Sequence, residues 1–71
     1  MIHLFSIQRD DGKFPEIGGT GRFVNKSGHR SAINLAEKVA RARTRLVRVE
    51  SFHEHEFYKP DAKPRVQIVR P

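Results

Sequence analysis

The sequence predicts a small α+β fold, with an antiparallel sheet of about four strands packed on one amphipathic helix in the order ββ(β)αββ. Two observations predict it. Short segments in which apolar and polar residues alternate lie on both sides of an alanine-rich stretch with a helical repeat. Turn-forming residues separate these segments. Residues 1–71 are expected to form one basic domain.

The N-terminal third is expected to supply the first strands. Residues 2–9 read as a strand with apolar side chains on both faces, which is typical of a covered or central strand. Asp10-Asp11-Gly12 predicts a tight turn, with the glycine at positive φ. Residues 13–17 can return as a second strand, interrupted or at an edge because Pro15 cannot donate a ladder hydrogen bond. Residues 22–24 can add a short further strand.

The helix is predicted from residue 29 to about residue 42, with Ser27 or Ser31 as its N-cap. At 100° per residue its apolar positions form one face, which Arg43 would enter, so the helix is expected to end near residue 42. Several alanines on this face would let the helix lie close to a sheet. The apolar positions are Ala32, Ile33, Leu35, Ala36, Val39, Ala40, Ala42 and Leu46.

The segment after the helix predicts two further strands. Residues 46–52 alternate, with the valines facing inward, and residues 65–69 form the last strand. Residues 53–58 either continue the first of these strands or begin another. The proline-rich stretch 60–64 is expected to be a loop.

Charge is the strongest functional signal. The chain carries 14 Lys+Arg against 8 Asp+Glu, a net charge of +6. Residues 18–49 hold eight of the basic residues and a single acidic one, Glu37. Such a field attracts polyanions: nucleic acid, an acidic protein face or anionic lipid. The absence of cysteine excludes disulfides and Cys-type zinc sites. The absence of cysteine also fits the reducing cytoplasm, and no run of about 18 apolar residues is present to span a membrane, so a cytoplasmic protein without a membrane partner is expected.

Basic side chains on and around the predicted helix make up the predicted binding surface, and Lys38, Arg41 and Arg45 among them have helical spacing. Arginine outnumbers lysine nine to five, which favours two-donor contacts to phosphate or carboxylate over mere solubility. The alternative is an ordinary solvated helix face. The predicted binding residues are Arg22, Arg30, Lys38, Arg41, Arg45 and Arg48, with Lys26, Phe57 and Tyr58 as secondary candidates. Reversing the charge of both Arg41 and Arg45 is expected to abolish binding and leave the fold intact.

Catalytic and metal sites are not expected, and neither is a cofactor. The glycines at 18–21 lack the Lys-Ser/Thr that ends a phosphate-binding loop. His53-Glu54-His55-Glu56 could begin a metal site with His3 or His29, but it lacks the HExxH spacing. Glu54 and Glu56 could serve as acid and base, yet nothing in the sequence marks a pocket between them.

Two families resemble the chain in layout. The alanine-rich segment 31–40, the short length and the lack of cysteine resemble the small inhibitors that bacteriophages encode against host machinery, including anti-CRISPR proteins. That resemblance implies a cytoplasmic inhibitor that covers a surface of a nucleic-acid-handling complex. Residues 5–9, followed by Asp10-Asp11-Gly12-Lys13, are similar to the hairpin of the small DNA-binding modules of phage-type integrases.

The sequence therefore predicts a non-enzymatic binding protein, of which two versions stay open. One is an inhibitor that binds an acidic protein surface of a nucleoprotein complex. The other is a domain that contacts DNA or RNA phosphates with the same basic residues. A chain this short buries a modest core, so dimerisation with a second copy would help to stabilise it.

Overall fold

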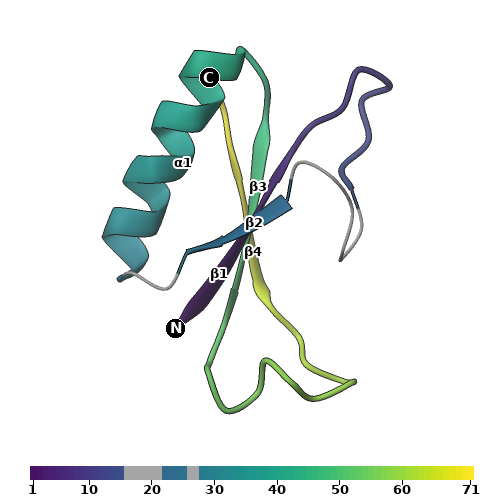
Figure 1. The fold of residues 1–71 in the computed structure, drawn as a ribbon, viewed down its shortest axis with the longest axis vertical. Helices are drawn as coiled ribbons and strands as arrows, with labels where there is room; N and C mark the ends of the chain where they lie inside the picture. Colours follow the sequence, from purple (N-terminus) through teal and green to yellow (C-terminus); the bar gives the residue numbers. More distant parts are fainter. Residues whose placement is uncertain (16–21, 26–27) are drawn as a thin grey trace.

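The computed structural model describes residues 1–15, 22–25 and 28–71. The elements are β1 (Ile2–Ile7), β2 (Arg22–Asn25), α1 (His29–Arg43), β3 (Val47–Phe52) and β4 (Arg65–Val69). The helix covers one face of the sheet (Figure 1). The predicted α+β class, with antiparallel strands and one helix, is confirmed.

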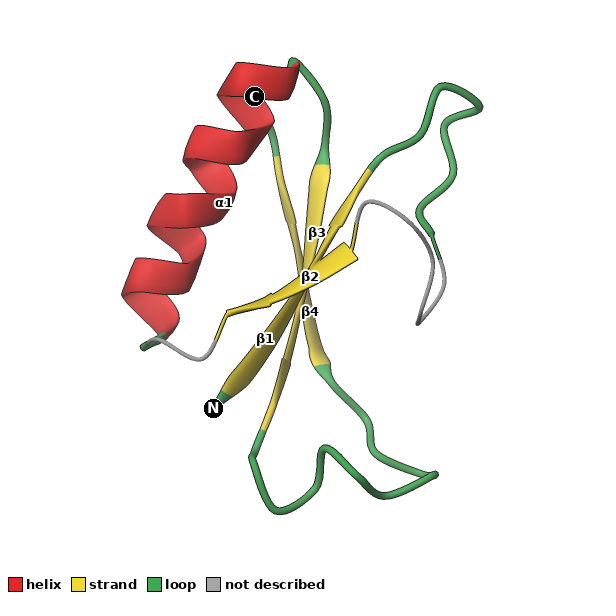
Figure 2. Cartoon of the chain, in the orientation of Figure 1, coloured by secondary structure: helices red, strands yellow, loops and turns green. Residues whose placement is uncertain are grey.

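The strands, yellow in Figure 2, form one antiparallel sheet. Their order in the sheet is β2-β1-β3-β4. The central position of β1 explains the apolar residues on both of its faces. The register pairs Phe5 with Val49 of β3, and Val49 with Gln67 of β4. The predicted strand at 22–24 is present as β2.

The predicted strand at 13–17 is wrong in its described part, because residues 13–15 belong to no strand. The Arg9 N–H donates to the Lys13 carbonyl at 2.8 Å, and the Lys13 N–H donates to the Asp11 carboxylate at 2.9 Å. These bonds close a turn, in which Gly12 takes the expected positive φ of 82°. Pro15 has no N–H to extend a ladder beyond the turn.

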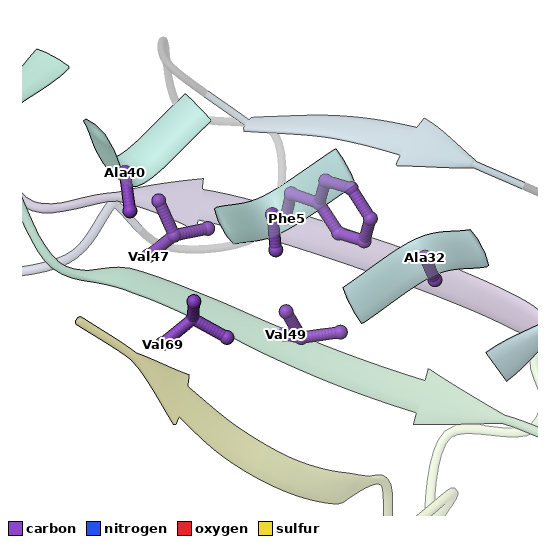
Figure 3. Packing of buried hydrophobic residues seen from close by; sticks show 7 residues of the cluster. Phe5, Ala32, Ala40, Val47, Val49 and Val69 are labelled. Atoms are coloured by element: carbon purple, nitrogen blue, oxygen red, sulfur yellow. The ribbon is translucent and has the colours of Figure 1, made fainter. Parts of the chain in front are cut away.

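Alanines set the packing of α1 on the sheet. Ala32, Ala36 and Ala40 are fully buried and lie four residues apart, so they form one line along the helix. The main core lies between this line and the sheet residues Phe5, Val47, Val49 and Val69 (Figure 3). Ala42, which the sequence placed on the same face, is exposed.

Backbone geometry defines both ends of α1. The N-cap is Gly28, without a side-chain cap bond, so the prediction of Ser31 is wrong; Ser27 lies outside the described residues. Thr44 takes a left-handed conformation (φ 53°) as the C-cap, and its N–H points to the carbonyls of Ala40 and Arg41. The helix therefore includes Arg43, which is exposed.

A second, smaller core lies on the other face of the sheet. Ile2, Leu4 and Phe52 are buried there, with Phe57 and Ala62 packed on them. The rings of Phe52 and Phe57 meet edge to face, with centroids 5.3 Å apart. Residues 53–58, expected to be a strand, form turns instead, and these turns carry Phe57 over the sheet.

A buried polar pair lies near the first turn of the helix. His3 Nδ1 and Ser51 Oγ are hydrogen-bonded at 2.7 Å, and both residues are buried. The Ser51→Ala variant removes this partner from an interior group, which is expected to cost about 1–3 kcal/mol of unfolding free energy in urea titrations. Ser31→Ala, a matched change at an exposed helix position, should shift it by less than about 0.5 kcal/mol. Equal effects of the two variants would contradict a stabilising role for the pair.

Candidate functional site

The outward side of α1 presents a polar, basic line opposite the buried alanines. Arg30, Asn34, Lys38 and Arg41 are spaced by four, four and three residues, and all are exposed. We call these four residues the outer stripe. At 1.5 Å per residue, the stripe is about 16 Å long.

The cations of the outer stripe are weakly compensated. Arg41 Nη2 lies 3.4 Å from a carboxylate oxygen of Glu37, one turn earlier. Both side chains are well exposed, and ion pairs of this kind contribute at most a few tenths of a kcal/mol. Within the described part of the chain, neither Arg30 nor Lys38 forms an ion pair. The stripe therefore presents its positive charge to solvent.

Arg45 does not belong to this surface. Its Nη1 donates to the carbonyl of Gln8 at 3.0 Å, and its Nη2 forms an ion pair with Asp10. These contacts tie the segment after α1 to the turn that follows β1. Charge reversal at Arg45 would set a carboxylate against Asp10, so the predicted Arg41/Arg45 variant would disturb this contact as well as the helix surface.

Arg48 lies on the opposite face of the sheet. Val47 and Val49 are buried under the helix, so the alternation of β3 directs Arg48 away from it. Its Nη2 donates to the Pro15 carbonyl at 3.2 Å, and the guanidinium lies 5.1 Å from the Phe14 ring centroid. Arg48 Nη2 also forms an ion pair with Glu50, whose Oε1 lies 3.5 Å away. Arg48 thus holds the 14–15 segment on the sheet, and the predicted surface spanning α1 and β3 is divided.

The other predicted site residues are scattered. Arg22 is the first residue of β2, and its side chain, like the whole of Lys26, lies outside the described part. Phe57 is half-buried in the second core, whereas Tyr58 is 79% exposed and meets the Phe57 ring edge to face. Of the six principal candidates, the structure therefore brings together Arg30, Lys38 and Arg41.

Three exposed features were missed by the sequence reasoning. Arg43 extends the basic end of α1, because the helix runs one residue further than predicted. A shallow groove of about 410 Å³ lies between α1 and β4, lined by His29, Arg30, Ile33, Asn34, Glu37 and Gln67. On β4, Val66 and Ile68 are 54% and 46% exposed. The alternation of β4 is visible in the sequence, but its place at the sheet edge is not.

Electrostatics in the turn after β1 are local. Arg9 Nη2 donates to the Asp11 carboxylate at 2.6 Å. This bond, together with the backbone N–H of Lys13, lowers the pKa of Asp11 below its ordinary value. The same pairing raises the pKa of Arg9. Both groups stay charged near neutral pH, and neither reaches the outer stripe.

The histidine-rich segment makes no ligand cluster. The rings of His53 and His55 stack with centroids 5.7 Å apart, in turns rather than on a strand. Among the residues that the structure describes, no three His, Asp or Glu side chains gather in a way that could hold a metal ion. The same residues include no helix that is both long and apolar enough to cross a membrane.

The chain matches no protein-family model, no curated protein and no solved structure. The outer stripe and its surroundings are therefore the basis on which a function can be assigned.

Proposed function

We propose that the protein is a non-enzymatic nucleic-acid-binding domain that contacts phosphates with the outer stripe of α1. The supporting observation is a row of exposed cations without buried or strongly paired counterions. Unpaired like charges on one helix face oppose folding, so they are retained where an external anion compensates them. Phosphate oxygens on a regular backbone are such an anion.

Charge along the helix matches this function. Arg30, Lys38, Arg41 and Arg43 are exposed on α1, and Glu37 is its one acidic residue. The stripe length of about 16 Å corresponds to about five base pairs at 3.4 Å each. Neutralising several phosphates releases condensed counterions, which is the main source of affinity in sequence-independent binding.

The composition of the stripe favours phosphate over an acidic protein face. Protein interfaces depend on a desolvated apolar centre with aromatic or aliphatic anchors. The stripe has no apolar side chain, and the exposed residues beside it, Ser31 and Ala42, are small. Small neighbours let a helix approach a nucleic-acid backbone closely. Asn34, in the middle of the stripe, offers both a donor and an acceptor to phosphate or a base edge.

A second candidate function is inhibition of a nucleic-acid-handling complex in the cytoplasm, as the resemblance to phage-encoded inhibitors implies. The observation in its favour lies away from α1: Val66, Ile68 and Tyr58 expose apolar surface of the kind a protein partner would cover. In this function the outer stripe would meet an acidic patch of the complex.

Fluorescence anisotropy with a labelled 20-base-pair duplex and a labelled single strand tests the first function. Binding in the micromolar range at low salt is expected for either form, within the usual limits of about 10⁻⁴ to 10⁻⁶ M for sequence-independent binding. Polyglutamate of matched charge should compete poorly. Failure to bind either nucleic acid, together with capture of a host protein that survives nuclease treatment, would replace the first function with the second.

A further inference from the structure

The outer edge of β4 is the most exposed strand surface in the described part of the chain. One edge of β4 pairs with β3, and among the described residues no strand pairs with the other. Arg65, Val66, Gln67 and Ile68 are all exposed. Backbone N–H and C=O groups of alternate residues point outward from such an edge, where an additional strand can bind them.

We propose that this edge binds an extended, acidic segment of a partner protein as a fifth strand of the sheet. Val66 and Ile68 lie on the sheet face away from the helix, because their register partners are Glu50 and Arg48. They are 54% and 46% exposed, although β-branched side chains of this kind are typical of a covered strand. An added strand would cover both, and its main chain would supply most of the affinity.

The charge around β4 selects the partner. Arg65 and Arg70 lie at the two ends of the strand, with Lys63 just before it, and all three are exposed. In the described part of the chain none of them forms an ion pair. An acidic strand laid along β4 would place its carboxylates between these cations. Charge complementarity of this kind fixes register and excludes wrong partners.

The same charges disfavour a second copy of the chain as the occupant. Two β4 strands paired antiparallel about Gln67 would align Arg65 with Val69 of the copy. Arg70 of the copy, the residue after Val69, would then lie diagonally opposite Arg65. By symmetry the same two like charges would meet at the other end of the pair. Pro64 and Pro71, which flank the strand, also limit pairing beyond it. Cations and prolines at an edge guard against self-association, but they leave it open to an acidic strand.

The test uses the isotopically labelled full chain and two synthetic seven-residue peptides, one alternating Glu with Val and the other alternating Lys with Val. The Glu/Val peptide should shift the backbone amide signals of residues 65–70 and bind at least tenfold more tightly than the Lys/Val peptide. In the Arg65→Glu, Arg70→Glu variant this preference should reverse. In the Lys38→Glu, Arg41→Glu variant, which alters the outer stripe alone, the wild-type preference should persist.

Each other outcome overturns the proposal in a recognisable way. Equal binding of the two peptides would remove charge as the selecting feature, and binding of neither would show that the edge is not a docking strand. Shifts confined to α1 would assign the peptide to the outer stripe. A dimer that forms through β4 as concentration rises, measured by sedimentation, would make a second copy the occupant. None of these results depends on whether the protein binds nucleic acid.

Discussion

The Lys38→Glu, Arg41→Glu variant is expected to bind a 20-base-pair duplex at least tenfold more weakly than the native chain, with its fold unchanged. Both side chains are exposed on the outer stripe, and neither supports the core. The variant loses two phosphate contacts and gains two negative charges next to the phosphates. Anisotropy titrations measure the affinity, and far-ultraviolet circular dichroism checks the fold.

A matched control separates the site from overall charge. The Lys59→Glu, Lys63→Glu variant has the same net charge as the Lys38→Glu, Arg41→Glu variant. Each substitution lowers the net charge by 2, so both variants go from +6 to +2. These lysines are exposed in the 53–64 loop, which packs on the sheet face opposite the helix. The control should lose less than about threefold in affinity, because distant exposed charges are screened beyond about 10 Å at 0.1 M salt. Equal losses in the two variants would show that net charge, and not the outer stripe, carries binding.

Phe5→Ala is expected to remove a large part of the chain's free energy of unfolding at room temperature. Phe5, on β1, is fully buried under α1 and belongs to the main core. Replacing a buried phenylalanine with alanine costs about 3–5 kcal/mol through lost burial and the cavity left behind. A domain of this size is stable by only about 4–10 kcal/mol in total. Urea unfolding followed by circular dichroism measures the loss.

Tyr58→Ala is the companion change, an aromatic residue truncated where its side chain is 79% exposed. The free energy of unfolding of this variant should be lower than that of the native chain by less than about 1 kcal/mol. The Tyr58 ring meets the Phe57 ring edge to face, and most of its surface is exposed to solvent. A Phe5→Ala variant as stable as Tyr58→Ala would mean that the core between helix and sheet is packed differently.

Local pattern explains why much of the fold could be predicted. The helical repeat from Ala32 to Ala40 and the alternation of Val47 and Val49 mark the side chains that are buried against a neighbouring element. The spacing of such buried positions is set by the geometry of the helix or strand alone, so it can be recognised in the sequence. The second strand could not be placed in this way. The sequence pattern predicts a strand at residues 13–17 and another at residues 22–24, whereas in the structure hydrogen bonds close a turn from Arg9 to Lys13 and residues 13–15 belong to no strand.

The candidate site was predictable only where no distant residue intervened. Arg45 continues the helical spacing of Arg41, and Arg48 is an outward position of the predicted strand that follows, so the sequence predicted one surface for all three. Arg45 instead meets Asp10, 35 residues earlier, and Arg48 meets Pro15, 33 residues earlier. Contacts at such separations follow from the sheet order, which local alternation does not specify.

Salt dependence of duplex binding tests the central claim most directly, because it counts the phosphates that the protein neutralises. With Arg30, Lys38 and Arg41 in contact, the logarithm of the association constant should fall against the logarithm of salt concentration with a slope of about −3. In the Lys38→Glu, Arg41→Glu variant the slope should approach about −1. A slope near zero, or the same slope for both proteins, would contradict phosphate binding by the outer stripe.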